Sequence, residues 1–212
     1  VTTGCCNTII GSYTGSTGLT NTIYIQGGTS SIKVNGSGLL VNGSAVGGGA
    51  GAVSVCGYNN IVSCISGTGV YGADNNFFGQ CAGCNNTGNF NNFFGNGAGY
   101  NNTTGSNNNF FGLAAGEYND TGCYNNFFGY IAGHFNTTGS HNNFLGDAAG
   151  HWNNTGCFNN FFGGGAGLNN TTGNFNNFFG GTAGYSNTTG SNNHFFGYGA
   201  GFFNTSGSYN NF

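Results

Sequence analysis

The sequence contains no proline and no methionine, and it has one basic and four acidic residues among 212. Lys33 is the single base, whereas binding to nucleic acid by counterion release needs several Lys or Arg side chains at the phosphates. The composition therefore argues against a nucleic-acid partner. No apolar run approaches the ~18 residues that a membrane-spanning helix requires, so we expect no membrane span.

Glycine, by contrast, is abundant and recurs at fixed positions, with 46 residues in all. From Asn75 onward the chain repeats the pattern N-N-F-F-G-x-x-A-G-x-x-N-T-T-G-x-x without interruption. The first unit is one residue short, and we place the gap between Gly83 and Asn85. A strict period with glycine at fixed places is typical of a solenoid, while glycine in every helix-length window argues against helices. We expect the array to continue past both ends of this sequence.

Each unit is best interpreted as one coil, with a short strand at N-N-F-F and tight corners at G-x-x-A-G and N-T-T-G. Glycine and asparagine at the corners would supply positive φ. We predict an all-β chain, a parallel β-solenoid (β-roll) with coils of ~17 residues, interrupted by a short β-hairpin-like insert. The expected parts are a partial coil at 1–15, a β-strand insert with a Gly-rich joint at 16–58, a degenerate coil at 59–74 and regular repeats at 75–212.

Parallel stacking places equivalent residues in columns. The first Asn and the first Phe of each strand, such as Asn108 and Phe110, are two residues apart and share a face. Each column holds one residue type throughout, so we assign both to the interior as an amide ladder and a stack of rings. The repeated Ala, such as Ala115, would fill a narrow corner of the coil.

The second ring of each pair then points outward, in a stripe about 40 Å long if coils stack at ~4.8 Å. A soluble monomer rarely exposes an apolar strip of that size. We expect another copy of the chain to cover it, or else another wall of the same chain; a flattened coil that turns both rings inward is the alternative. The predicted self-association residues are Phe78, Phe94, Phe111, Phe128, Leu145, Phe162, Phe179 and Phe196.

The stretch "NNFFGNGAGYNNTTGSNN", residues 91–108, resembles repeats in the shafts of phage and large-virus tail fibres. More distantly, it is similar to the head repeats of trimeric autotransporter adhesins, which form a left-handed parallel β-roll. "SSIKVNGSGLLVNGSAV", residues 30–46, looks like the strand modules that interrupt viral fibres. The resemblance implies a homotrimer or a long fibre, and it implies architecture more firmly than function.

The strongest chemical signal is the pattern Asn-x-Ser/Thr, which marks acceptors of N-linked glycans in exposed turns of secreted chains. We expect glycans along one stripe of the coil, where they would also keep an almost uncharged rod soluble. The alternative is turn chemistry alone, because N-T-T-G makes an Asx-type corner without any sugar. The predicted acceptors are Asn35, Asn42, Asn85, Asn102, Asn119, Asn136, Asn153, Asn170, Asn187 and Asn204, while Asn101 and Asn169 overlap neighbouring sites.

The eight cysteines are an even number, which suits an oxidising compartment. Cys56 and Cys64 bracket a short segment and could pair, and Cys81 and Cys84 flank one corner as C-A-G-C. A zinc ion at that C-x-x-C is a weaker interpretation. The remaining disulfide candidates, in one column after the T-G corner, are Cys5, Cys123 and Cys157. Cys123 and Cys157 would be ~9–10 Å apart, beyond the ~7 Å limit of a bridge, so any partner would lie in another column or chain.

Glu117, His134 and His151 follow one another in the column after Ala-Gly and are weak candidates for a metal site. That column also holds varied residues, as exposed positions do, so we expect no metal and no cofactor apart from N-linked glycans. No Ser/His/Asp or paired-carboxylate arrangement is present, and we expect no enzymatic activity.

These patterns favour a structural protein that forms the shaft of an extracellular or virion fibre by self-association, as a trimer or a helical filament. The alternative is an adhesin segment that recognises surface glycans by stacking them on tyrosines. The candidate tyrosines are Tyr100, Tyr118, Tyr124, Tyr130, Tyr185 and Tyr198. Ice binding through Thr pairs such as Thr103 and Thr104 fits poorly, because ice-binding solenoids usually separate their two outward Thr by one inward residue.

Overall fold

The computed structural model describes residues 72–212 in full and, for seven strands between Thr8 and Val62, the backbone alone. The described parts contain only β-strands and turns, with no helix and thus none able to cross a membrane. The early strands are β1 (Thr8–Ile10), β2 (Ile23–Gly27), β3 (Ser30–Asn35), β4 (Gly38–Val41), β5 (Ser44–Ala45), β6 (Val53–Ser54) and β7 (Asn60–Val62). The later strands are β8 (Asn76–Phe78), β9 (Asn92–Phe94), β10 (Asn109–Phe111), β11 (Asn126–Phe128), β12 (Asn143–Leu145), β13 (Asn160–Phe162), β14 (Asn177–Phe179) and β15 (His194–Phe196).

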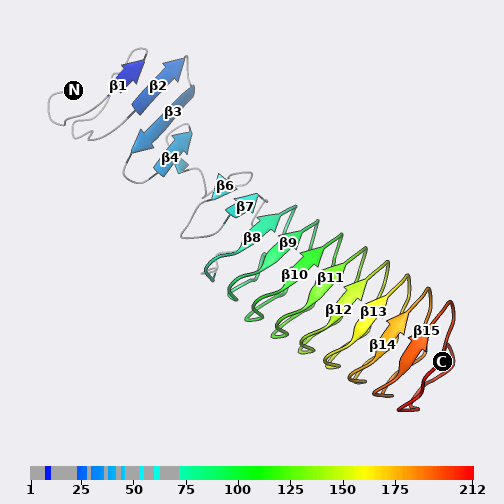
Figure 1. Ribbon diagram of the computed structural model, residues 1–212. Helices are drawn as coiled ribbons and strands as arrows, with labels where there is room; N and C mark the ends of the chain where they lie inside the picture. Colours follow the sequence, from blue (N-terminus) through cyan, green and yellow to red (C-terminus); the bar gives the residue numbers. More distant parts are fainter. Residues whose placement is uncertain are drawn as a thin grey trace.

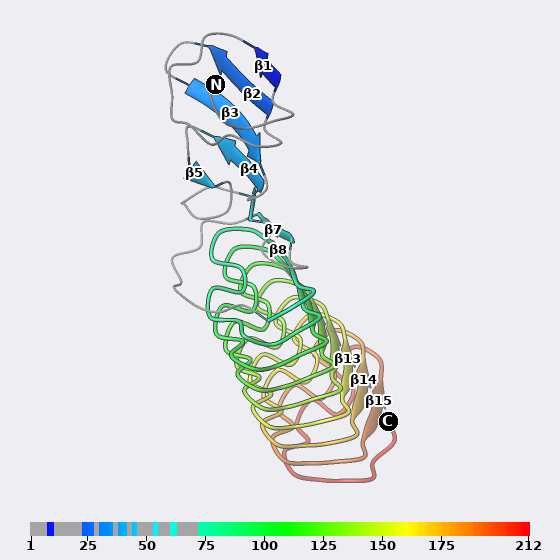
Figure 2. The same cartoon turned by 90° about the vertical axis from the view of Figure 1, so that its left-hand side faces the viewer.

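The strands β8 to β15 lie one per coil and stack in sequence order, as Figure 1 shows. All seven pairings among them are parallel, and like residues face like: Phe110 is opposite Phe127, and Phe127 is opposite Phe144. Figure 2 shows the closed coils following one another along the same axis. The predicted all-β parallel solenoid, with one repeat unit per coil, is therefore confirmed.

The part before the regular coils contains both a strand of the solenoid sheet and the antiparallel strands of the predicted insert. Strand β7 pairs in parallel with β8, with Asn60 opposite Asn76, so it continues the solenoid sheet through the segment expected to be a degenerate coil. Strands β2 to β5 form an antiparallel meander within the range of the predicted insert. Strand β1 is different, because it pairs with β2 in this five-stranded sheet rather than with the solenoid. Strand β6 pairs with β7, so it belongs to the solenoid sheet.

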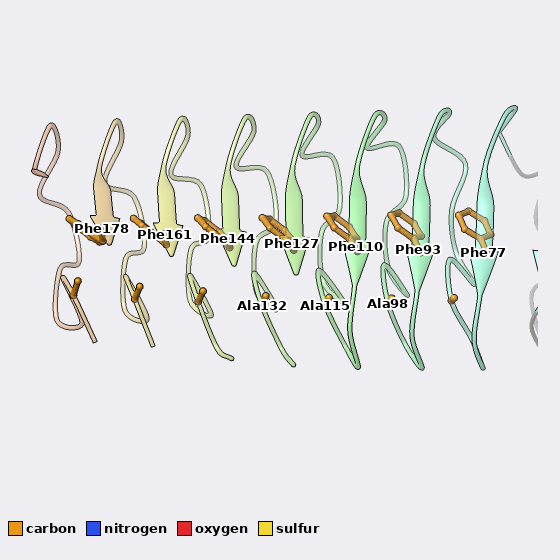
Figure 3. Close-up of a cluster of buried hydrophobic side chains, with 14 of the residues drawn as sticks. Phe77, Phe93, Ala98, Phe110, Ala115, Phe127, Ala132, Phe144, Phe161 and Phe178 are labelled. Carbon is orange, nitrogen blue, oxygen red and sulfur yellow. The ribbon is translucent and has the colours of Figure 1, made fainter. Parts of the chain in front are cut away.

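The first Phe of each strand fills the interior, as predicted. In the seven strands from β9 to β15 this Phe is fully buried, and the rings of successive strands stack with centroids 4.8 Å apart. The residues are Phe93, Phe110, Phe127, Phe144, Phe161, Phe178 and Phe195. Figure 3 shows this column of rings, with Ala98, Ala115 and Ala132 across the interior from it. The glycine after each Ala packs against the ring: a Cβ added to Gly116 would lie 2.5 Å from a ring carbon of Phe110. A glycine is thus required at each A-G corner, where the backbone opposite the strand approaches the Phe ring.

The remaining interior is closed by buried asparagines. The strand residue Asn108 accepts a hydrogen bond from the backbone N–H of Asn125 on the next coil. Its Nδ2 donates to the carbonyl oxygen of Gly122 at 2.8 Å. This arrangement recurs from coil to coil, and it leaves the amide groups paired, as buried polar groups must be. The predicted interior position of this column is confirmed, but its side chains bond mainly to backbone groups of the neighbouring coils rather than to one another.

The expectation that glycine supplies positive φ holds at one corner and fails at the other. Both glycines of G-x-x-A-G have it, with φ of 145° at Gly112 and 58° at Gly116, but the glycine of N-T-T-G does not. Gly122 is needed instead because an added Cβ would lie 2.3 Å from the carbonyl oxygen of Gly139.

Residues in two columns of variable composition also have a left-handed backbone conformation. One column includes Ile131 and Thr182, and the other includes Tyr124 and His141. Stacking imposes this conformation on β-branched residues that avoid it in isolation.

Candidate functional site

The second Phe of each strand points outward, and its column runs along the outer face of the solenoid sheet. Neighbouring rings stack with centroids 4.7 Å apart for Phe94 and Phe111 and 4.8 Å apart for Phe111 and Phe128. Phe78 and Phe196 are 56% and 58% exposed, and Leu145 is 37% exposed. The other members are half-buried or exposed as well. We call this column the Phe stripe: Phe78, Phe94, Phe111, Phe128, Leu145, Phe162, Phe179 and Phe196.

Within residues 72–212, neither alternative that kept the Phe stripe inside one chain agrees with this arrangement. The coil does not turn both rings inward, because Phe110 is fully buried while Phe111 lies on the opposite face of the strand. Nor does any wall of residues 72–212 cover the stripe, since its members keep their exposure there. Beside it runs a ladder of outward amides in which Asn109 donates to Asn126 at 2.8 Å. The sheet therefore presents a flat face of stacked rings and amides.

The asparagines at the N-T-T-G corner, predicted to carry glycans, point into the coil instead. Their side chains are fully buried, and each Nδ2 donates to the Oδ1 of the corner Asn on the preceding coil and to a nearby Gly carbonyl oxygen; for Asn136 these partners are Asn119 and Gly139. A glycan is attached through this same nitrogen and needs an exposed turn. The glycan stripe is therefore wrong for Asn102, Asn119, Asn136, Asn153, Asn170 and Asn187.

The remaining predicted acceptors lie in other environments. Asn85 is exposed, because the short first unit lacks a residue between Thr87 and Gly88 rather than near Gly83. Asn85 therefore stacks below Asn101, to which its Nδ2 donates at 3.0 Å. Asn204 is half-buried on the final coil, and the overlapping sites Asn101 and Asn169 are half-buried too. Asn42 and the side chain of Asn35 lie outside the described residues.

Cys123 and Cys157 carry unbridged thiols that belong to a ladder along the coils. The sulfur of Cys123 accepts a hydrogen bond from the backbone N–H of Ser106. The backbone N–H of Cys123 donates to the hydroxyl of Ser140, and the backbone N–H of Ser140 donates to the sulfur of Cys157. Cysteine here replaces a serine acceptor. Neither thiol is bridged within residues 72–212, and a bridge to another chain stays a prediction.

The other predicted cysteines give no support for a bridge or a zinc ion. Cys84 is buried, and Cys81 is half-buried with a φ of 56°. Within residues 72–212, no group of three His, Cys, Asp or Glu could hold a metal ion. Cys5, Cys56 and Cys64 lie outside the described residues.

Glu117, His134 and His151 do lie on consecutive coils, but they do not converge on one point. The Nδ1 of His134 is 3.6 Å from Oε2 of Glu117 and 3.2 Å from the carbonyl oxygen of Ala114. The rings of His134 and His151 stack in parallel with centroids 5.2 Å apart. Burial lowers the pKa of His151, the Ile131 carbonyl raises it, and His134 lowers it further. This is a stacked pair rather than a metal site.

The candidate tyrosines do not form one platform, because they belong to several columns. A different aromatic cluster is present: Tyr118, Phe135 and Trp152 stack on consecutive coils, with centroid distances of 5.1 and 4.2 Å. Phe135 and Trp152 were not among the predicted site residues. The signal that could have found them is their spacing, because each follows the preceding aromatic residue by one repeat unit. Some hydroxyls of the Thr pairs form hydrogen bonds between coils, since Thr171 Oγ1 donates to the carbonyl oxygen of Thr188 on the next coil.

The chain matches no profile of a protein family, no curated protein and no solved structure. What it does must therefore be argued from the solenoid and its surfaces.

Proposed function

We propose that this chain is a structural protein, the rigid shaft of an extracellular or virion fibre that assembles with copies of itself through the Phe stripe. The observation that carries the proposal is the exposure of stacked apolar side chains along eight consecutive coils. Contiguous apolar surface on this scale marks an interaction site.

A second copy of the chain is the partner that suits this surface. The stripe rises by about 4.8 Å per coil, and an identical stripe has the same rise, so the rings of two copies can interdigitate all along their length. Paired sheets with like side chains in register form dry, tightly packed interfaces of this kind. The near absence of charge also leaves little to repel a second copy.

The interior suits a mechanical role. Each coil is joined to the next by a parallel strand pairing, by stacked rings and by buried amides, and all three repeat along the axis. Stability in such arrays is roughly the sum of nearest-neighbour terms, so length can grow without a new kind of contact. A shaft needs that property and needs no catalytic group.

Sedimentation and light scattering across a concentration series would test the assembly. We expect the unaltered chain to form a trimer or a filament, and the double variant Phe111→Ser, Phe128→Ser to shift strongly toward the monomer. The matched control Phe158→Ser, Phe203→Ser removes two exposed rings from other columns, at 46% and 86% exposure. Circular dichroism would establish that both variants keep their β structure.

Two results would overturn this proposal. One is an unaltered chain that stays monomeric throughout the series. The other is a stripe variant that assembles as well as the control variant does.

A further inference from the structure

The stack of Tyr118, Phe135 and Trp152 ends abruptly at Trp152. The same column continues with Asn169 on the next coil and with Ser186 on the coil after that, each one repeat unit further along the chain. Backbone hydrogen bonds between consecutive coils maintain this column, from the N–H of Trp152 to the carbonyl oxygen of Leu168 and from that of Asn169 to Tyr185. Two short polar residues thus follow three aromatic ones.

This change opens a groove beside one face of the indole. The ring of Phe135 covers the other face, at a centroid distance of 4.2 Å and an angle of 9°. Trp152 remains 45% exposed. The groove beyond it is lined by Trp152, Asn169, Thr171, Ser186, Thr188 and Thr205. An exposed indole face therefore borders a largely apolar surface that carries one side-chain amide and four hydroxyl groups.

The polar groups of the groove include some that the fold does not use. Among residues 72–212, neither the side-chain amide of Asn169 nor the hydroxyl of Ser186 makes a hydrogen bond within the protein. The hydroxyls of Thr171 and Thr188 donate to carbonyl oxygens of the next coil at 3.0 and 2.9 Å. Their oxygens can still accept. The groove thus offers donors, acceptors and one apolar face, without a charged lining residue.

We propose that this groove binds a neutral saccharide, with one pyranose ring stacked on Trp152. The C–H face of a pyranose is apolar and suits an aromatic ring, while its hydroxyl edge suits amides and hydroxyls. Nucleobases also stack on aromatic rings, but their phosphates need cations, and Lys33 is the single base of the chain. Phe203, three coils beyond Trp152, lies ~14 Å away by strand spacing, which leaves room for one or two sugar rings.

The chain carries a direct reporter of this site, because Trp152 is its single tryptophan. Titration with neutral oligosaccharides of glucose, galactose and mannose, followed by indole fluorescence, should give a saturable change for at least one of them. Proton NMR with saturation transfer from the protein would identify the sugar ring that contacts it. A sulfated polysaccharide should give no change that survives moderate salt.

Two variants test the location. Ser186→Phe fills the groove with a ring of the kind that Phe203 already provides in this column, and we expect it to weaken binding about ten-fold or more, equivalent to at least about 1.4 kcal/mol. Trp152→Ala should abolish the contact in the NMR experiment. Phe158→Ala, which removes a 46% exposed ring from another column, is the matched control and should bind normally.

This proposal is independent of assembly through the Phe stripe, because Ser186→Phe leaves that surface unchanged and should sediment as the unaltered chain does. Absence of saturable binding across the neutral panel would overturn the saccharide site. So would full binding by Ser186→Phe, or preferential binding of the sulfated polysaccharide.

Discussion

The side-chain nitrogen of Asn136 donates a hydrogen bond of 2.7 Å to the Oδ1 of Asn119 on the preceding coil. The Oδ1 of Asn136 in turn accepts from Asn153 at 2.7 Å. Both residues are fully buried, so the column of corner asparagines is a continuous amide ladder inside the solenoid. The triplet that suggests a glycan acceptor is here part of the core.

Replacing Asn136 should therefore harm the fold rather than a modification. Asn136→Ala removes one hydrogen bond from the Oδ1 of Asn119 and one from the Nδ2 of Asn153. Each buried N–H or lone pair left unpaired in this way costs about 1–3 kcal/mol. We expect the free energy of unfolding to fall by about 3 kcal/mol or more, measured by denaturant titration. The matched control is Thr138→Ala, which removes the acceptor triplet by changing an exposed residue.

The control should unfold like the unaltered chain, and intact-mass measurement on protein from a glycosylating host should find no sugar at Asn136. Equal loss of stability in both variants would contradict the ladder as its cause. A glycan found at Asn136 in folded protein would contradict its burial.

The glycine of each A-G pair should tolerate no side chain. A Cβ on Gly133 would lie 2.4 to 2.7 Å from three ring carbons of Phe127, and φ there is 58°. Overpacking costs about 1–3 kcal/mol and the left-handed conformation about 1–2 kcal/mol, so we expect Gly133→Ala to destabilise the chain by about 3 kcal/mol. Thermal unfolding followed by circular dichroism would measure this.

Gly164→Ala is the appropriate comparison, because the nearest atom to its added Cβ is 3.9 Å away and its φ is not positive. That variant should melt near the unaltered chain. If Gly133→Ala had the same melting temperature as Gly164→Ala, the close approach of the A-G corner to the Phe127 ring would be refuted.

The half-buried His151 should make stability depend on pH. Burial holds the pKa of His151 below its ordinary value of 6.5, so the unfolded chain takes up a proton more readily than the folded chain does. This contribution to stability is complete above pH 6.5 and is lost as the pH falls through the lowered pKa. We expect a lower melting temperature at pH 5 than at pH 8.

His151→Leu should reduce this difference, and Leu168 already occupies the same column on the next coil. His194→Asn is the control, since His194 is exposed and Asn177 stands in its column one coil earlier. A pH dependence that His151→Leu leaves intact would contradict His151 as its origin.

The architecture could be predicted from the sequence because its columns are nearly uniform. A strict period that repeats Phe110 and Asn108 at fixed offsets can bury both only by placing like residues above like. The outward direction of Phe111 followed from strand alternation. These inferences need only the period and the pleat, which the chain carries locally.

The direction of the corner side chains was decided by the closed coil. The letters N-T-T are the same whether the amide of Asn136 meets solvent or the amide of Asn119, and only the path of the backbone through the corner turns it inward. Left-handed Ile131 likewise takes its conformation from stacking between coils, against its own preference. From Asn91 onward the sequence alone determined which residues share a column, because that depends on a constant spacing. The tertiary structure decided that Asn86 rather than Asn85 joins the corner column of the short first unit. It also decided which columns face inward at the corners, because that depends on how each coil closes.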